Sequence, residues 1–364
     1  MDINEERLEI IYKLAVWYAE DLSSGVQFEC TLNCEESLQD EEDKVNRHSN
    51  VDLNTVKAKT RFQTYLELIR FPLFPIPIVT TLSGVVLASS GSISWKGYMA
   101  LVIALIGYFG GMMKNDYFHS ETDALVSPQK PIPSGRVSRK KVFIFASMIY
   151  VICVLSGFLM NYKAGLMVIL LIMLSHLYNA IFKEKGILGS VTLPLGIALM
   201  SIFGSVAVSG QIPAMVWYCF AGILLYDFGA HIATTFKDID HDRRIGIVTT
   251  PIQIGTKPAL VLSTIATVAA FVIISLPYVF GKAGPGYLIW LALSIGTVVI
   301  TRLPLLVRQN HDNGYLALKG SMIGAIALYP SLIGTVFSIT ICALIILIPY
   351  LLSAVLLEAT SQRV

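Results

Sequence analysis

The sequence predicts an all-α integral membrane protein, built as a bundle of about nine transmembrane helices. Hydrophobic residues make up 54% of the 364 positions, charged residues only 14%, and the mean hydropathy is +0.66. A soluble domain of this size needs far more polar surface. Apolar segments of about 20 residues, enough to cross a bilayer, recur beyond Arg70. Because no strand-period alternation appears, closed helices are the expected way to satisfy the backbone in lipid.

Two regions are expected: an acidic cytosolic extension over residues 1–60 and a transmembrane domain over residues 61–364. The extension holds 14 acidic and 6 basic residues, which leaves 11 acidic and 21 basic residues for the rest of the chain. Residues 8–22 predict one amphipathic helix, expected to pack on the bundle because its charges are acidic. Residues 28–59 predict a loose linker. We expect no cleaved signal peptide, and the 5 scattered cysteines predict neither a zinc site nor a disulfide framework.

Hydropathy places nine spans, at roughly 71–91, 95–114, 141–160, 164–182, 187–209, 213–236, 258–280, 286–307 and 336–357. The stretch over residues 315–334 is apolar but interrupted by Gly, Ser and Pro, and it is either a tenth span or a surface helix. Lys and Arg gather in the connections after spans two, four, six and eight. The positive-inside rule therefore places the N-terminus and these connections in the cytosol. With nine spans, the C-terminus would lie on the opposite side.

A first acidic segment lies at the end of span two. Taken as one helix at about 100° per residue, Asn115, Asp116, His119 and Asp123 share a stripe of about 100°, and Glu121 points away from it. Carboxylate and amide oxygens are the ligands that Mg²⁺ prefers, and usually only one or two come from the protein. The segment is therefore a candidate magnesium site.

Basic residues beside this segment are candidates for binding phosphate. The prolines of residues 131–135 stiffen a loop that would aim Lys130 and Arg136 at phosphate oxygens. Arg70, just before span one, would either reach the same phosphates or anchor the helix at the headgroups.

A second acidic segment lies at the end of span six. Asp238 and Asp242 lie four residues apart and share a helix face, whereas Asp240 points elsewhere. The same face leads back to His231 and then to Asp227, about 16 Å deeper in the membrane. Acids at membrane depth are costly, so their presence suggests a function. Asp227 and His231 would either activate an acceptor and take up its proton, or pair with each other as a buried couple.

Lys237 and Arg243 flank the second segment, so each acidic segment lies beside basic side chains. This combination suits a chelated diphosphate, since metal ions and cations neutralise the charge of a departing group. The alternative is that both segments are ordinary solvated loops. Two segments at equivalent points, one of them reached from an intramembrane aspartate, argue against that alternative.

The two segments resemble the aspartate motifs of the UbiA superfamily of intramembrane prenyltransferases. The motif N-D-x-x-D-x-x-x-D is matched at Asn115, Asp116 and Asp123, and the motif D-x-x-x-D at Asp238 and Asp242. The trailing P-I-P-S-G-R is matched as well, and the resemblance extends over about residues 62–357. It implies a UbiA-like bundle of nine helices in which these five residues hold a prenyl diphosphate through Mg²⁺. The prenyl group would then be transferred to an aromatic or lipid acceptor.

One position departs from the family pattern, because His119 stands where the first motif has its middle aspartate. Imidazole is a poor ligand for Mg²⁺. The first metal would therefore be held by the remaining motif residues, be held more weakly, or be absent. His119 itself would either bind diphosphate as an imidazolium or be neutral and structural, and both alternatives stay open.

Three functions are weighed on these residues. The first is Mg²⁺-dependent prenyl transfer, with a prenyl diphosphate, the bilayer and an acceptor as partners and no nucleic acid. The second is a membrane terpene cyclase of the same superfamily, which needs no acceptor. The third is a cation-coupled transporter, which would explain Asp227 and His231 but not the P-I-P-S-G-R segment. Polar residues within the expected cavity favour transfer over cyclisation.

Overall fold

The computed structural model describes residues 60–244 and 246–361 of the chain. The amphipathic helix and the linker predicted for the N-terminal extension lie outside the described residues. The described residues form helices joined by short turns, and their one β pairing is an isolated bridge between Lys185 and Val248. The predicted all-α integral membrane protein is confirmed.

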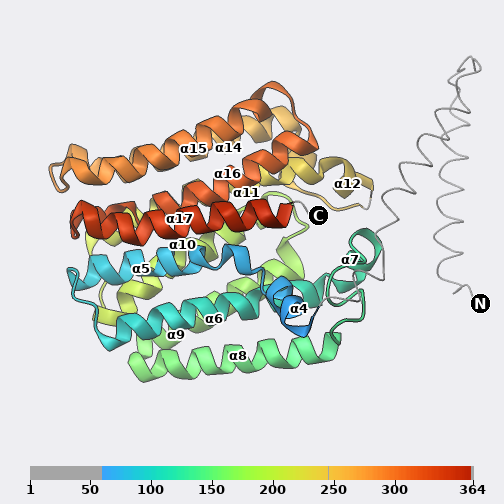
Figure 1. Ribbon diagram of the computed structural model, residues 1–364, viewed down its shortest axis with the longest axis horizontal. Helices are drawn as coiled ribbons and strands as arrows, with labels where there is room; N and C mark the ends of the chain where they lie inside the picture. The colour runs from blue at the N-terminus through green and yellow to red at the C-terminus, as the bar shows by residue number, and fades with distance from the viewer. Residues whose placement is uncertain (1–59, 245, 362–364) are drawn as a thin grey trace, which may run out of the picture. The chain divides into compact units, whose positions relative to one another are not determined.

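Ten helices of the described residues, counted with the short turns that continue them, are long and apolar enough to cross a membrane. They lie side by side in Figure 1. In chain order they are α5 (Pro75–Ser89), α6 (Trp95–Phe118), α8 (Arg139–Met160), α9 (Tyr162–Leu177), α10 (Ile187–Ser209), α11 (Ala214–Thr234), α14 (Thr256–Val279), α15 (Leu288–Val307), α16 (His311–Leu328) and α17 (Ile339–Ser361).

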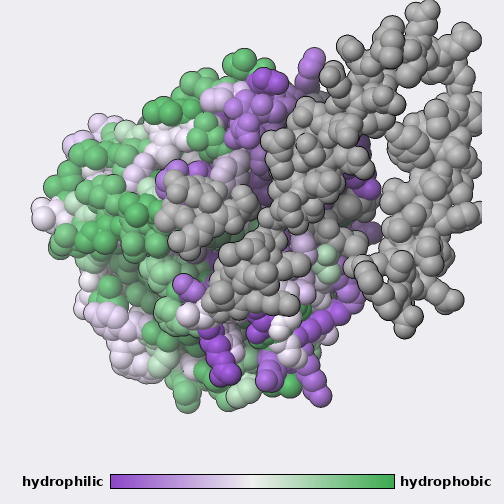
Figure 2. All heavy atoms as spheres, turned by 45° about the vertical axis from the view of Figure 1, so that its right-hand side comes forward, coloured by the Kyte–Doolittle hydropathy of each residue, from purple (hydrophilic) through white to green (hydrophobic). Residues whose placement is uncertain are grey.

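Shorter helices complete the fold, and most of them lie at one end of the bundle (Figure 1). They are α4 (Arg61–Leu68), the turn η1 (Phe71–Leu73), α7 (Ser120–Val126), the π-helix η2 (Tyr178–Phe182), the 3₁₀ turn η3 (Thr235–Asp238), α12 (Ile239–Arg244), α13 (Thr250–Ile254), η4 (Pro285–Tyr287) and η5 (Ser331–Thr335). We call the end that carries α7 and α12 the motif end. Figure 2 shows hydrophilic residues gathered toward this end and apolar residues over the spans.

The nine predicted spans all appear as helices. The tenth helix is formed by the segment over residues 315–334, for which the sequence allowed either a span or a surface helix. This segment forms α16, and 72% of its most apolar stretch, in the span 311–335, is buried inside the bundle. It therefore packs among the other helices instead of lying on the surface.

The extra span changes the expected position of the C-terminal helix. Ser353 of α17 donates a hydrogen bond to the carbonyl of Pro72 at 3.4 Å, and Lys319 pairs with Glu358 at 2.8 Å. Pro72 lies just before α5, at the motif end. Nine spans would have ended α17 at the other end of the bundle; with α16 as a tenth span, α17 runs back to the motif end.

Small residues allow the central helices to approach closely. A Cβ atom placed on Gly84 of α5 would lie 1.8 Å from the Ser201 carbonyl oxygen of α10. Likewise, a Cβ atom on Gly204 of α10 would lie 2.2 Å from the Thr81 carbonyl oxygen of α5. Such contacts are typical of membrane helices, which associate through close packing because lipid supplies no hydrophobic drive between them.

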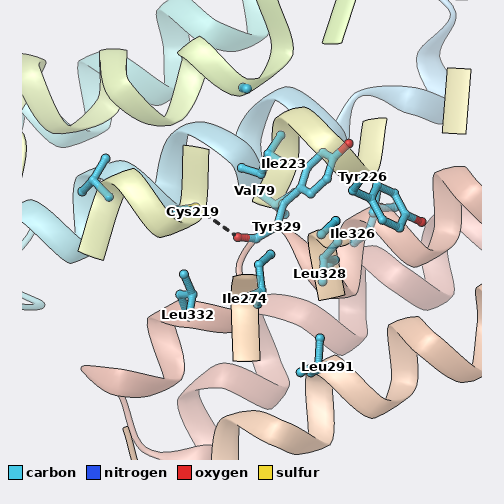
Figure 3. Close-up of a cluster of buried hydrophobic side chains, with 14 of the residues drawn as sticks. Val79, Cys219, Ile223, Tyr226, Ile274, Leu291, Ile326, Leu328, Tyr329 and Leu332 are labelled. Atoms are coloured by element: carbon cyan, nitrogen blue, oxygen red, sulfur yellow. Dashed lines mark hydrogen bonds between the residues drawn. The ribbon is translucent and has the colours of Figure 1, made fainter. Parts of the chain in front are cut away.

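A second group of buried side chains joins α11, α14, α15 and α16 (Figure 3). The rings of Tyr226 and Tyr329 meet edge to face at 5.8 Å, and the Cys219 thiol donates to the Tyr329 carbonyl oxygen at 3.7 Å. Tyr226, Tyr329 and Ile274 are almost wholly buried. These residues form the wall behind the site described below.

The α5–α10 contact predicts a stability defect. In Gly204→Ala, the added methyl group must push the two helices apart, and we expect a loss of about 1–3 kcal/mol. The measurement is the melting temperature in detergent, which should fall. Gly296→Ala on α15 is the matched control, since no atom lies within 4 Å of its added Cβ. Equal melting temperatures for the two variants would contradict the close packing.

Candidate active site

A cavity of about 350 Å³ opens between the helices below the motif end. Arg70 and Asn115 line the part of the cavity at the motif end, which we call its mouth, and Ile103 of α6 and Phe203 of α10 line it farther from that end. Asn115 and Ile103 lie 12 residues apart on α6, so the cavity descends about 18 Å along this helix. Most of its lining is apolar. The cavity therefore suits an amphiphile with a charged head and a long hydrocarbon tail.

The mouth is organised by the side chain of Asn115. Its Oδ1 accepts a hydrogen bond from Arg70 Nη2 at 2.8 Å, and its Nδ2 donates to Asn179 Oδ1 at 2.7 Å. Arg70 Nη2 also lies 3.3 Å from Asp116 Oδ1. One amide thus ties together the chain before α5, the end of α6 and the end of α9.

Two irregular backbone segments aim these side chains at the cavity. Arg70 has a φ of 49°, a left-handed conformation that residues other than glycine rarely adopt. Tyr178 and Asn179 lie on the π-helix η2, a form that appears mostly at functional sites. Strain of this kind persists only where the surrounding structure holds it, and it clusters at ligand-binding sites.

The first acidic segment keeps the predicted face. The helix breaks at His119, between α6 and α7, but the backbone bonds from His119 to Asn115 and from Asp123 to His119 continue the helical pattern. Asn115, Asp116, His119 and Asp123 are all buried, whereas the Glu121 side chain is exposed and pairs with Arg139 on the surface. Lys130 Nζ binds Asp123 Oδ1 at 2.7 Å.

His119 is uncharged at neutral pH. Its pKa is lowered to about 4, first by burial and then by the positive charge of Lys183. Nδ1 lies 3.4 Å from Glu184 Oε1, and Nε2 is buried without a hydrogen-bond partner among the described residues. Burial, the Lys183 charge and the unpartnered Nε2 favour the neutral side chain over the imidazolium, and the nearby Glu184 carboxylate acts in the opposite direction.

Arg136 is placed differently from the prediction. Its guanidinium binds both carboxylate oxygens of Glu67, at 2.8 and 3.1 Å, and it also donates to the Gln129 carbonyl oxygen. The side chain is almost wholly buried. Because its donors are directed at α4 and at its own loop, Arg136 fixes the loop in place instead of reaching a diphosphate.

The second acidic segment is less regular than a single helix. The 3₁₀ turn η3 separates α11 from α12, so Asp238 and Asp242 differ in their surroundings. Asp242 is buried, whereas the Asp238 side chain is 40% exposed and binds Lys237. Asp240 points elsewhere, as predicted, and both it and Arg243 are exposed.

Lys183 lies near both acidic segments, although from the sequence it is only one of the positive charges that orient the chain. It lies within electrostatic range of Asp123 from the first segment and of Asp242 from the second. Burial, with the charges of Arg70 and Lys130, lowers its pKa to about 8. Its position directly after span four, at the same end as both segments, is the signal that could have identified it.

Asp227 and His231 do not form the buried couple that was one alternative. Asp227 Oδ1 accepts a hydrogen bond from Tyr329 at 3.0 Å, and Oδ2 is buried without a partner among the described residues. His231 Nδ1 contacts Ser190 Oγ at 3.0 Å, and Nε2 lies 3.4 Å from the Tyr178 hydroxyl. Asp227 and His231 both line the cavity.

The acidic residues suit Mg²⁺ only together with a phosphate ligand. Within the described residues, no three His, Cys, Asp or Glu side chains gather as a ready metal site. Asp116, Asp123 and Asp238 are each paired with a cation instead. Mg²⁺ needs only one or two carboxylates when phosphates and water complete its shell, so this donor set fits it.

Asn115 fits the predicted metal role poorly. Its oxygen already accepts from the Arg70 guanidinium, and a divalent cation at the same oxygen would meet that positive charge. The side chain therefore holds the mouth together, and Asp116 and Asp123 are left as the metal candidates of the first segment.

A helical membrane bundle with a charged mouth above an apolar cavity suits a protein that binds amphiphiles within the bilayer. Residues 78–326 match the UbiA prenyltransferase family. The chain belongs to this family and is an integral, multi-pass membrane prenyltransferase. The transporter alternative is thereby contradicted.

Known relatives agree with this assignment. The chain is 31% identical over 277 residues to the digeranylgeranylglyceryl phosphate synthase of Methanopyrus kandleri, covering 74% of this chain and 100% of that enzyme. The enzyme of the same name from Methanothermobacter thermautotrophicus is 26% identical over 261 residues, covering 71% and 90%.

Solved structures show the same fold. A UbiA homolog from Aeropyrum pernix K1 has a TM-score of 0.60 at 20% identity, covering 71% of this chain and 97% of that chain. A UbiA homolog from Archaeoglobus fulgidus bound to GPP and Mg²⁺ has a TM-score of 0.54 at 14% identity, covering 81% and 99%.

The lowered pKa of Lys183 predicts pH-dependent binding of a diphosphate. The protonated amine binds the anion, so above pH 8 the free protein must first take up a proton. The Kd of a prenyl thiolodiphosphate should therefore rise by up to about tenfold per pH unit above pH 8. Calorimetric titration between pH 7 and 9.5 measures this slope.

Lys183→Arg should remove most of the slope, because a guanidinium stays charged throughout this range. Lys185→Arg, at an exposed position two residues away, is the matched control and should keep the parental slope. Identical slopes for the parent and Lys183→Arg would exclude Lys183 from the diphosphate site.

Proposed function

We propose that the protein transfers a prenyl group from a prenyl diphosphate to a lipid acceptor, with Mg²⁺ as cofactor. The observation that carries this proposal is the cavity itself, in which about 18 Å of apolar wall lies below Arg70 and Asn115, and Arg70 is ion-paired with Asp116 of the first acidic segment. The diphosphate would bind at the mouth and the prenyl chain would occupy the apolar part. Enclosure matters because water would otherwise capture the allylic cation.

The mouth residues divide into two groups in this proposal. Asp116, Asp123, Asp238 and Asp242 would hold Mg²⁺. Bound there, Mg²⁺ neutralises the negative charge that develops on the diphosphate as its bond to carbon breaks. Arg70, Lys130 and Lys183 would bind the phosphate oxygens directly, because all three lie within electrostatic range of the first segment. Lys237 and Arg243 would contribute from the second segment.

A hydroxyl-bearing lipid is the acceptor that the cavity and the relatives support best. The relatives are digeranylgeranylglyceryl phosphate synthases, so we propose a prenylated glyceryl phosphate as the acceptor class in place of an aromatic compound. The acceptor oxygen would form the new bond to the prenyl carbon, the bond to diphosphate would break, and the hydroxyl proton would pass to the protein. Asp227 and His231, which both line the cavity, are the groups placed to receive it.

Cyclisation without an acceptor is the competing reaction. The altered first motif at His119 is the feature that favours it, and the two polar residues within the cavity favour an acceptor. We also propose that the motif end faces the cytosol, because the connections at this end carry most of the Lys and Arg residues.

A product analysis tests the proposed function. The detergent-purified protein is incubated with C10 to C20 prenyl diphosphates and Mg²⁺, with and without a geranylgeranylglyceryl phosphate acceptor, and extracts are analysed by mass spectrometry. We expect an ether-linked product only when the acceptor is present. A cyclic hydrocarbon or terpene alcohol formed without acceptor would favour the cyclase.

The same assay contains a matched pair of variants. Asp238→Asn should lower turnover by about 10²-fold or more, since a group that stabilises the departing charge is lost. Asp240→Asn, at the exposed neighbouring acid, should leave turnover unchanged. Equal activity in the two variants would contradict the assignment of Asp238.

The depth of the cavity predicts control of prenyl length. Gly107 lines the cavity eight residues below Asn115, about 12 Å down α6, and its added Cβ would meet only Cys153 Sγ, at 3.7 Å. In Gly107→Leu the side chain would fill the lower cavity. We expect the kcat/KM for C20 relative to C10 prenyl diphosphate to fall at least about tenfold, since a blocked apolar site loses 1–3 kcal/mol.

Gly296→Leu is the control for this substitution, because Gly296 is also helical with open space around it but does not line the cavity. Its chain-length preference should match the parent. An unchanged preference in Gly107→Leu would place the prenyl chain elsewhere.

A further inference from the structure

Arg302 is a charged residue within a transmembrane helix that the reaction described above does not use. It lies on α15, five residues or about 8 Å from the end of that helix at the motif end. Its Nη1 donates to Thr267 Oγ1 of α14 at 2.7 Å, and its Nε and Nη2 donate to Ser321 Oγ of α16 at 3.2 and 2.8 Å. In the described part of the chain, no carboxylate lies within ion-pair distance of it. An arginine at this depth is costly and is expected to have a functional partner.

Asp227 is a carboxylate within electrostatic range of this charge. Arg302 is the cation that acts electrostatically on Asp227, and Asp227 is the carboxylate that acts on Arg302. The two side chains come from different helices, α11 and α15: Asp227 lines the cavity, whereas Arg302 is not among the residues that line it. The guanidinium therefore affects the reaction without touching a substrate.

A continuous set of contacts connects the two residues. Ser321 receives the Arg302 guanidinium through its hydroxyl, and its carbonyl oxygen accepts from the Tyr226 hydroxyl at 2.8 Å. The Tyr226 ring packs edge to face on Tyr329, as Figure 3 shows, and Tyr329 donates to Asp227 Oδ1. Ser321 and Asp227 both line the cavity. Oδ1 of Asp227 is thus held by the Tyr329 hydroxyl, and Oδ2 is left without a partner among the described residues.

We propose that Arg302 is a positioning residue that keeps Asp227 as a carboxylate, with Oδ2 free to accept the hydroxyl proton of the acceptor. A carboxylate without a counter-charge is costly in an apolar bundle, and the nearby guanidinium offsets part of that cost. During transfer, the acceptor oxygen forms a bond to the prenyl carbon. The carbon–oxygen bond to diphosphate breaks with its electron pair on the diphosphate, and the acceptor proton moves to Asp227 Oδ2. This inference rests on the proposed function.

The test separates transfer from diphosphate release. Asp227→Asn should lower the kcat of transfer about 10²-fold, as the loss of a general base does, and Arg302→Gln should lower it at least about tenfold. In both variants, the KM for prenyl diphosphate and the slow release of diphosphate without acceptor should stay within twofold of the parent. The double variant should be no slower than Asp227→Asn, because both substitutions remove the same function.

Two further variants keep the test decisive. Arg302→Lys retains the charge and should keep transfer within about fivefold of the parent. This variant still tests the role of the charge if Arg302→Gln fails to fold. Arg308→Gln, at the exposed end of α15, should be unchanged. Parental transfer in Arg302→Gln, multiplied defects in the double variant, or equal loss of acceptor-free diphosphate release would overturn the role of Arg302. A parent protein that turns over no prenyl diphosphate at all would instead overturn the proposed function, and this inference with it.

Discussion

The two hydrogen bonds of the Asn115 side chain are the interaction on which the site depends. The amide accepts from Arg70 and donates to Asn179, and it thereby holds the left-handed residue before α5 and the π-helix after α9 against the end of α6. Both backbone irregularities would relax without a common partner. Because the amide is neutral, it can hold a cation on one side and a polar side chain on the other without adding charge to the mouth. Asp116 and Asp123 lie on the same face, each paired with a cation beside the mouth.

The site is divided by depth. Charges concentrate at the mouth, where Lys183 spans the interval between the two acidic segments, and apolar side chains line the cavity below. Asp227 is the exception, since it lies inside the bundle with one oxygen unpaired. A prenyl donor needs only the mouth and the apolar wall. A polar group at the depth of Asp227 is useful where an acceptor must lose a proton, which is why this residue favours transfer over cyclisation.

The sequence predicted the spans and the shared face of the first acidic segment well, because hydropathy and helical spacing are local properties. The fifth span, residues 187–209, was placed at the bounds that the structure gives to α10. Partners were harder to predict. Nothing local to Arg136 indicates that Glu67, on a short helix that the sequence analysis did not place, takes up its guanidinium. Lys183 acquires its role only when the loop after α9 meets both acidic segments. The charge state of His119 was equally hard to predict from the sequence, because its neutral state follows from burial and from the nearby Lys183 charge.

The central claim is that one cavity holds the diphosphate at its mouth and the prenyl chain below. The most direct test is an experimental structure with a C20 prenyl thiolodiphosphate and Mn²⁺, with the metal located by anomalous scattering. The account predicts metal and phosphorus between Asp116 and Asp242, Lys183 in contact with the phosphate oxygens, and the chain passing Gly107 toward Ile103. A chain lying outside this cavity, or a diphosphate remote from Lys183, would contradict it.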